Sequence, residues 1–380
     1  MWKVQGLPAG VFLLFLASCA TPMGAGVGTA TTPAPPAGTP HYWVYVANES
    51  SDLVSRVRFD GENAVEEKTI GIGIMPADLD GAHGVTVSPR GDYWYVSLAH
   101  GTPFGKVWKF TTGSDTLVDS ATVGLFPASM AVTPDGSSLF VVNFNLHGRR
   151  VPSSVSAIFT PFMNESRQIQ TCVMPHGSKI TKDGWRHYST CMMSDQLVEI
   201  STEREEVARR LALTPGRERL LSIDDMGTEQ SMSGERCKPT WVAIAPDDKR
   251  LYVPCNGHAE ILELDAKSLE VTRRFPTGKA PYNADVSSDG RLLVVTLKGA
   301  QAVAIVDLAT GEEVQVPTTQ PITHGVAISP DSRYAFISNE AIGAIRGTVD
   351  VIDLRSKQRV ASTEVQHQPG GISFWKMETR

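Results

Sequence analysis

The sequence has no excess of basic charge. Its 380 residues include 35 Lys and Arg against 41 Asp and Glu, which gives a formal net charge of -6. Domains that bind nucleic acid usually carry a basic face that contacts the phosphates. No nucleic-acid partner is therefore expected.

Several catalytic motifs are also missing. The chain contains no Cys-x-x-Cys-His, no His-Glu-x-x-His, no Gly-x-Ser-x-Gly and no Gly-rich loop before Lys-Ser/Thr. These motifs attach haem, bind catalytic zinc, present a nucleophilic serine and cradle phosphate, respectively. Their absence weighs against the corresponding enzyme classes but leaves open a site assembled from separate segments.

Long hydrophobic runs are absent too, and the apolar run at 11–16 is too short to span a membrane. It follows Lys3 and leads into Leu-Ala-Ser before Cys19, a pattern that resembles a lipoprotein signal peptide. We expect a signal peptide at 1–18, lipidation (palmitate) of Cys19 and a flexible Thr/Pro/Ala/Gly tether at 19–40. The alternative is a plain signal peptide cleaved near Ala20.

This pattern predicts a location in the periplasm, with the lipid anchor as the only membrane contact. Lipoproteins retained in an inner membrane usually carry Asp after the lipidated Cys. Here that position is Ala20, so the outer membrane is the expected site.

What the sequence does contain is a repeat. A short apolar run leads into a Ser/Thr-Pro-Asp-Gly-like turn and out into a second apolar run, as at 84–97, 130–143, 177–190, 241–254, 284–296 and 325–338. Turn residues between two strand-like runs predict a β-hairpin. A second pair of short strands follows in most copies, and four strands per 42 to 64 residues are typical of a propeller blade.

A seventh copy is divided between the two ends of the chain. The run at 369–375 is typical of an inner strand, and its missing partner is the run at 42–48. Pairing the two would close the ring and leave no free sheet edge. The sequence therefore predicts an all-β, seven-bladed β-propeller of four-stranded blades over 41–380, closed by N- and C-terminal strands.

The repeat resembles the YVTN-repeat seven-bladed propellers of bacterial envelopes. Its clearest copies are Tyr-Val-Ala-Asn at 45–48, Phe-Val-Val-Asn at 140–143 and Phe-Ile-Ser-Asn at 336–339. The resemblance implies a fold and a compartment. It implies no single activity, because similar propellers include binding proteins, lactonase-like hydrolases and domains of copper and haem enzymes.

Apart from Cys19 there are four cysteines, at equivalent places in two successive repeats. Each pair lies at opposite ends of a predicted hairpin, which favours disulfides Cys172–Cys191 and Cys237–Cys255 in an oxidising compartment. Four cysteines allow three connectivities, and a thiolate metal site is the competing interpretation.

The residues that open the inner strands form a predicted ring around the channel mouth. In blade order they are Gly370, His83, Ala128, His176, Thr240, Tyr282 and His324. Imidazoles from three blades could bind copper or zinc, with Tyr282 or water completing the shell. The alternative is that His83, His176 and His324 only hydrogen-bond to backbone or water, while the Gly after each lets the strands crowd the axis.

The remaining histidines, among them His187 and His258, are expected at the surface or at blade edges. The loops at 100–104, 147–152, 217–236 and 341–346 are expected at the channel mouth, which would make that face the working face. The leading hypothesis is a binding module that presents its mouth, including Thr240 and Tyr282, to a small ligand or an envelope protein. The alternative is a metal-binding or lactonase-like propeller, with a ring His or Asp224, Asp225 or Glu229 as the base.

Overall fold

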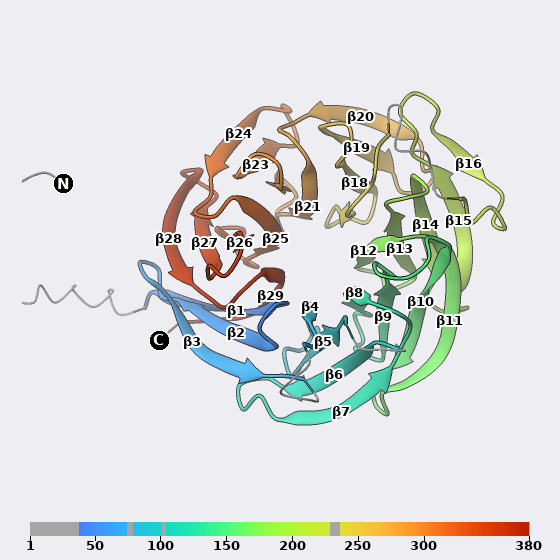
Figure 1. Cartoon of the computed structure of the whole chain (residues 1–380). Helices are drawn as coiled ribbons and strands as arrows, with labels where there is room; N and C mark the ends of the chain where they lie inside the picture. Colours follow the sequence, from blue (N-terminus) through green and yellow to red (C-terminus); the bar gives the residue numbers. More distant parts are fainter. Residues whose placement is uncertain (1–37, 74–78, 101–103, 229–235, 380) are drawn as a thin grey trace, which may run out of the picture. The chain divides into compact units, whose positions relative to one another are not determined.

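The computed structural model describes residues 38–73, 79–100, 104–228 and 236–379. Over these residues the chain forms seven antiparallel sheets arranged around a central channel (Figure 1). The sheets are propeller blades, which we letter A to G around the ring. The predicted all-β, seven-bladed fold is confirmed. Within the described ranges, no helix has the length and apolar character that crossing a bilayer requires.

The first four blades contain the N-terminal strands and the C-terminal one. From the axis outward, their strands are β29 (Pro369–Thr379), β1 (Pro40–Asn48), β2 (Leu53–Phe59) and β3 (Ala64–Gly71) in blade A; β4 (Ala82–Val87), β5 (Tyr93–Leu98), β6 (Lys106–Thr111) and β7 (Leu117–Thr122) in blade B; β8 (Pro127–Val132), β9 (Ser138–Asn143), β10 (Pro152–Phe159) and β11 (Asn164–Val173) in blade C; and β12 (Pro175–Ile180), β13 (Arg186–Cys191), β14 (Gln196–Ser201), β15 (Glu206–Ala212) and β16 (Arg219–Leu221) in blade D.

The other three blades have four strands each. They are β17 (Ala243–Ile244), β18 (Arg250–Cys255), β19 (Glu260–Asp265) and β20 (Val271–Pro276) in blade E; β21 (Pro281–Val286), β22 (Leu292–Leu297), β23 (Ala302–Asp307) and β24 (Glu313–Pro317) in blade F; and β25 (Ile322–Ile328), β26 (Tyr334–Glu340), β27 (Thr348–Asp353) and β28 (Gln358–Glu364) in blade G.

Blade A joins the two ends of the chain, as the divided repeat predicts. The C-terminal β29 is its inner strand and pairs antiparallel with β1, for example Tyr45 with Ser373 and Val44 with Phe374. Trp375 also donates its indole N–H to the carbonyl of Gly91 in blade B, at 3.1 Å. The N- and C-terminal strands therefore close the ring.

The Ser/Thr-Pro-Asp-Gly-like segments are the turns between the first and second strands of blades B to G. In blade F, Ser287 Oγ donates to Asp289 Oδ1 at 2.6 Å and accepts from the Leu292 amide at 2.9 Å. Gly290 adopts a φ of 72°, which favours glycine. We call this face of the ring the turn side and the opposite face the mouth side.

The hydroxyl residue of the Tyr-Val-Thr-Asn motif joins neighbouring blades. Ser97, Thr296 and Ser338 each accept a backbone N–H from their own inner strand, at 2.8 to 2.9 Å. Each then donates to a carbonyl of the next blade, that of Ala128, His324 or Gly370, at 2.6 to 2.9 Å. The motif therefore fixes the position, along the channel axis, of the residues at the start of the inner strands.

The glycine after each ring histidine allows this close approach. A Cβ added at Gly84 would lie 2.0 Å from the carbonyl oxygen of Ala128, and one at Gly325 would lie 2.6 Å from that of Gly370. A side chain at either position would force the blades apart. The predicted packing role of these glycines is confirmed.

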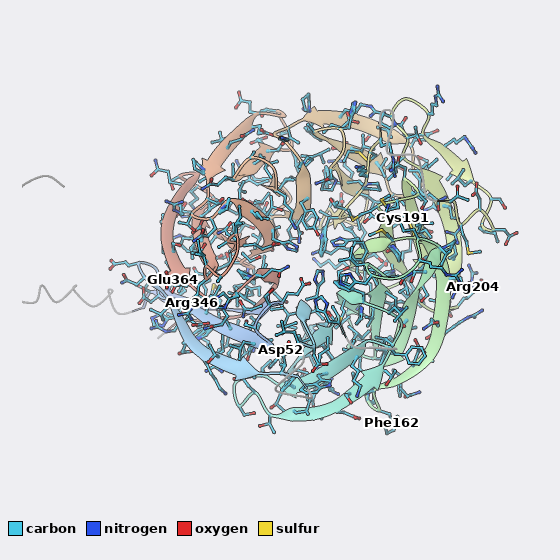
Figure 2. All side chains as sticks on the ribbon, viewed as in Figure 1. Asp52, Phe162, Cys191, Arg204, Arg346 and Glu364 are labelled. Carbon is cyan, nitrogen blue, oxygen red and sulfur yellow. A yellow bond between two sulfur atoms is a disulfide. The ribbon has the colours of Figure 1, made fainter. Side chains whose placement is uncertain are left out.

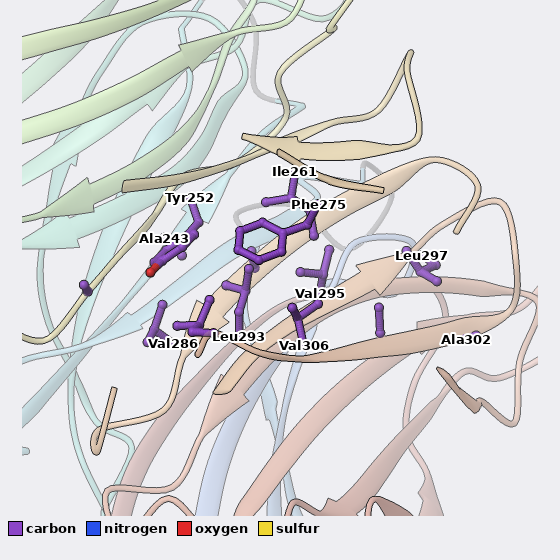
Figure 3. Close-up of a cluster of buried hydrophobic side chains, with 14 residues drawn as sticks. Ala243, Tyr252, Ile261, Phe275, Val286, Leu293, Val295, Leu297, Ala302 and Val306 are labelled. Carbon is purple, nitrogen blue, oxygen red and sulfur yellow. The ribbon is translucent and has the colours of Figure 1, made fainter. Parts of the chain in front are cut away.

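The hydrophobic core lies between blades, in separate clusters around the ring. Figure 3 shows the cluster between blades E and F, where Tyr252 and Phe275 pack against Leu293, Val295 and Val306. A second cluster joins the closing blade to its neighbour, with Tyr42 and Phe59 against Tyr334 and Phe336. Side chains fill the space between the blades (Figure 2).

Both predicted disulfides are present. Cys172 is bonded to Cys191 and Cys237 to Cys255, with Cα–Cα distances of 5.9 and 4.3 Å. Cys191 lies on β13 of blade D (Figure 2). A thiolate metal site is thereby overturned, because a sulfur in a disulfide is not a thiolate.

Two features of blade D were not predicted. Part of the 217–236 segment forms a fifth strand, β16, on the outer edge, where it pairs with β15. His187 was expected at the surface or a blade edge, but it is fully buried on β13. Its Nε2 lies 2.7 Å from Ser178 Oγ, and its ring stacks on Phe140, so the prediction for His187 was wrong.

Candidate functional site

Four aromatic rings form a closed circuit across the channel, and we call them the ring layer: His83, His176, Tyr282 and His324. Neighbouring ring centroids are 4.7 to 6.3 Å apart around the circuit. All four lie at the second or third residue of an inner strand, close to the strand starts where they were predicted, and they come from blades B, D, F and G. The structure therefore brings the three predicted histidines and Tyr282 together at one level.

His176 uses both of its ring nitrogens in the fold. Nδ1 lies 2.8 Å from the carbonyl of Thr240, which can only accept, so Nδ1 carries the proton. Nε2 then accepts from Tyr282 Oη at 2.9 Å. Burial lowers the pKa of His176 to about 3, so the ring is neutral. Thr240 itself is fully buried and its hydroxyl donates to the Tyr282 carbonyl at 2.6 Å.

A second set of residues lies against the mouth side of the ring layer. Each follows the last residue of a Tyr-Val-Thr-Asn-like motif, so the repeat places them at equivalent positions. Three of them, Glu49, Lys298 and Glu340, are charged and contact the layer, and Phe144 packs against His176 at 4.8 Å. These charged residues were missed at the sequence level, although their fixed place after the motif could have revealed them.

Glu49 is held by two histidines. Its Oε2 lies 2.8 Å from His83 Nδ1, and its Oε1 lies 3.0 Å from His100 Nε2. Burial alone would raise the pKa of Glu49, but the charges and hydrogen bonds of His83 and His100 hold it well below its usual range. The hydrogen bond to Glu49 also raises the pKa of His100, against the effect of burial. Glu49 is therefore ionised.

Glu340 and Lys298 form a looser group around His324. Lys298 Nζ lies 3.2 Å from Glu340 Oε1 and 4.4 Å from the centre of the Tyr282 ring. His324 Nε2 is 3.5 Å from the same carboxylate oxygen. Burial, followed by the charge of Lys298, lowers the pKa of His324 well below its usual value. His324 is therefore neutral as well.

A cavity of about 250 Å³ lies along the channel. Its wall includes the three ring-layer histidines and the inner strands as far as Val87, Val132 and Ile180, which precede the turns. None of the described residues of the mouth-side loops lines it. The cavity therefore extends from the ring layer toward the turn side, whereas the sequence had pointed to the mouth.

Two polar atoms in the cavity wall lack a hydrogen-bond partner among the described residues. They are Trp241 Nε1, which can only donate, and His324 Nδ1. Asn283 lines the same cavity, and Lys179 does so while paired with Asp285 at 3.1 Å. Buried polar groups are normally satisfied. The channel therefore presents hydrogen-bonding groups that the fold does not use.

The three ring-layer histidines are not arranged as a set of metal ligands in this structure. In the part of the chain that the structure describes, no three His, Cys, Asp or Glu side chains are placed to hold a metal ion. His176 in particular has both nitrogens occupied.

The other predicted site residues lie elsewhere or outside the description. Asp224 and Asp225 are exposed on the loop after β16, away from the channel cavity. Glu229 and Cys19 fall outside the described residues.

Comparisons with known proteins support the fold. Neither a protein-family model nor a curated protein matches the sequence. Among solved structures, a protein of unknown function from Desulfotomaculum acetoxidans is 15% identical, with 88% of this chain and 98% of that one covered and a TM-score of 0.65. Hydrazine synthase of Kuenenia stuttgartiensis is 22% identical over 74% of this chain and 80% of that one, with a TM-score of 0.56.

A provisionally assigned 6-phosphogluconolactonase from Bacteroides fragilis is 15% identical, with 91% of this chain and all (100%) of that one covered and a TM-score of 0.65. Identities this low establish the architecture only. The chain is thus a seven-bladed β-propeller whose fold is similar to that of lactonase-type propellers.

Proposed function

We propose that the protein is an exported binding protein that holds one small, oxygen-rich molecule in its channel cavity. The observation that carries this proposal is the pair of unsatisfied groups, Trp241 Nε1 and His324 Nδ1, in the wall of one cavity. A bound molecule that supplies an acceptor to Trp241 and a donor to His324 would satisfy both. Carboxylic acids that carry two or more hydroxyl groups, and their lactones, have this combination of groups.

The size and charge of the cavity narrow the ligand further. About 250 Å³ is just below the usual range of small-molecule pockets, so a protein segment would not enter it. Lys179 gives the wall a cation, but Asp285 lies 3.1 Å from it and offsets its charge. This balance favours a neutral or singly charged molecule.

We further propose that the protein works outside the cytoplasm. Two disulfides in one chain favour an oxidising compartment. Lipidation at Cys19 and retention at the outer membrane are part of the same proposal. Replacing Cys19 with Ser should then release the protein from the membrane fraction, and a Cys19→Ser protein that still fractionates with membranes would contradict the anchor.

Thermal-shift and calorimetric titrations with small hydroxycarboxylates and their lactones test the binding site. Trp241→Phe should weaken binding about 3- to 10-fold, as expected for one lost hydrogen bond. Trp185→Phe is the matched control, because Trp185 is exposed and outside the channel. If no member of the panel binds, or if both variants bind like the wild type, the proposed site is wrong.

A further inference from the structure

His83 differs from the other two ring-layer histidines in how its nitrogens are used. Nδ1 lies 2.8 Å from the carboxylate of Glu49, which can only accept a hydrogen bond while ionised. In the neutral form of His83, the proton therefore sits on Nδ1 and Nε2 carries a lone pair. By contrast, His176 has both nitrogens bonded, and His324 Nε2 lies 3.5 Å from Glu340, a carboxylate that Lys298 also contacts at 3.2 Å.

The surroundings of His83 fix the orientation of its ring. Phe126, His176 and His324 all meet it edge to face, with centroids 5.2 to 6.3 Å away. On the far side of Glu49, His100 holds the second carboxylate oxygen at 3.0 Å. His83 and Glu49 are both largely buried, with 11% and 12% of their side chains exposed. An imidazole oriented by a fixed carboxylate is the arrangement of a general base.

His83 and a hydrogen-bond donor without a partner among the described residues line the same cavity. His83 and Trp241 both line the channel cavity, and Trp241 Nε1–H has no partner among the described residues. An N–H in a buried wall can stabilise the negative oxygen that develops when water attacks a carbonyl. Asn283, in the same wall, offers a side-chain amide for the same purpose.

We propose that the channel cavity hydrolyses small carboxylic esters or lactones, with His83 as the general base and Glu49 as its positioning residue. The inference rests on the proposed function, because the substrate occupies the same cavity. His83 Nε2 takes a proton from water while the water oxygen bonds to the carbonyl carbon. The tetrahedral intermediate then expels the alcohol oxygen, the C–O bond breaks, and the proton passes from His83 to that oxygen. The products are the acid and the alcohol, and no oxidant or metal ion takes part.

Steady-state hydrolysis of p-nitrophenyl acetate and of δ-valerolactone tests the proposal on the full-length protein. His83→Asn should lower kcat at least 100-fold, the usual contribution of a general base. Glu49→Gln should lower kcat about 10-fold or more with little change in KM, and Glu49→Asp should recover part of that loss. A merely structural role for Glu49 would not separate kcat from KM in this way.

The chain offers a matched control for these variants. His258 and Glu260 form a histidine–glutamate pair with a 3.2 Å separation where β18 turns into β19 of blade E, and 36% of the His258 side chain is exposed. His258→Asn removes a similar imidazole and should leave the rate unchanged.

Binding of each probe is followed separately, by quenching of Trp241 fluorescence relative to Trp241→Phe. If the wild type binds the probes but hydrolyses them no faster than His83→Asn, the catalytic inference is overturned and the binding site stands. If neither probe binds but members of the hydroxycarboxylate and lactone panel do, the catalytic inference is overturned and the binding site stands; if neither the probes nor the panel bind, the proposed function fails first and this inference fails with it.

Discussion

The side chains between the blades and those at the channel axis differ in polarity. Between blades, the second-strand residue that pairs with the fourth residue after the ring residue is buried and apolar in six blades: Val44, Trp94, Leu139, Leu251, Leu293 and Ala335. At the axis, polar rings and charges gather, and two polar atoms have no partner among the described residues. Apolar packing stabilises the ring, whereas unsatisfied polar groups at the axis do not. The blade interfaces maintain the fold, and the polar axis supports our proposal that the channel holds a ligand.

Blade D is the exception, because it has polar residues at positions between blades that are otherwise apolar. Ser178 and His187 occupy positions that are apolar in the other six blades, and both are buried. His187 Nδ1 has no partner among the described residues. A polar pair in an otherwise apolar layer costs stability unless it is fully hydrogen-bonded.

The largest effect should follow removal of β29. Deleting residues 369–380 removes the inner strand of blade A and exposes the edge of β1 together with Tyr42, Val44 and Val46. We expect aggregation or loss of a cooperative thermal transition, because an unpaired edge and an open core face are created together. Differential scanning calorimetry and gel filtration measure this. A truncated protein that melts like the full chain would show that the blade interfaces do not maintain the fold.

Breaking the disulfides should have the next largest effect. Replacing Cys172 and Cys191 with Ala removes a cross-link that spans 19 residues, and the second bridge spans 18. Each double variant should lose about 2 to 5 kcal/mol of unfolding free energy in urea melts. Peptide mapping without reductant should recover only the two native pairs, and a free thiol at any of these four cysteines in the wild type would contradict the assignment.

The acid sensitivity of the fold should come from the buried histidines. Burial lowers the pKa of His176 and His187 to about 3, below their unfolded value near 6.5. Between those values the unfolded chain binds more protons than the folded one, so stability present above pH 6.5 falls as the pH decreases. Each histidine should contribute about 1 kcal/mol per pH unit over this window. Urea melts between pH 6.5 and 4.5 measure the slope.

His187→Leu tests both this pH dependence and the expectation that apolar residues between blades stabilise the fold. Leu occupies the equivalent position in blades C, E and F, as Leu139, Leu251 and Leu293. Together with Ser178→Ala, the change should raise stability by about 1 kcal/mol at pH 7 and flatten the slope below pH 6.5. A less stable double variant with an unchanged slope would show that the polar pair supports the fold.

The repeat explains why so much of the fold could be predicted. Each copy of the repeat specifies a hairpin and the residue that lies beside the channel axis. The divided copy therefore predicted ring closure, and the alignment of successive copies predicted both cysteine pairs. The charged residues Glu49, Lys298 and Glu340 were missed because, in any single copy of the repeat, the residue after the Tyr-Val-Thr-Asn-like motif resembles the start of a loop. His187 was misplaced because a buried polar residue breaks the apolar pattern that marks the core. The cavity could not be located, because its free volume depends on how side chains from several blades meet.

The central claim is that the polar groups at the axis are there for a ligand. It is tested most directly by titrating the wild type, Trp241→Phe and Trp185→Phe with the hydroxycarboxylate and lactone panel in an isothermal calorimeter. We predict one binding site per chain in the wild type, weakened about 3- to 10-fold only by Trp241→Phe, with the thermal stability of both variants close to that of the wild type. Absence of binding across the panel, or equal affinity in all three proteins, would contradict the account.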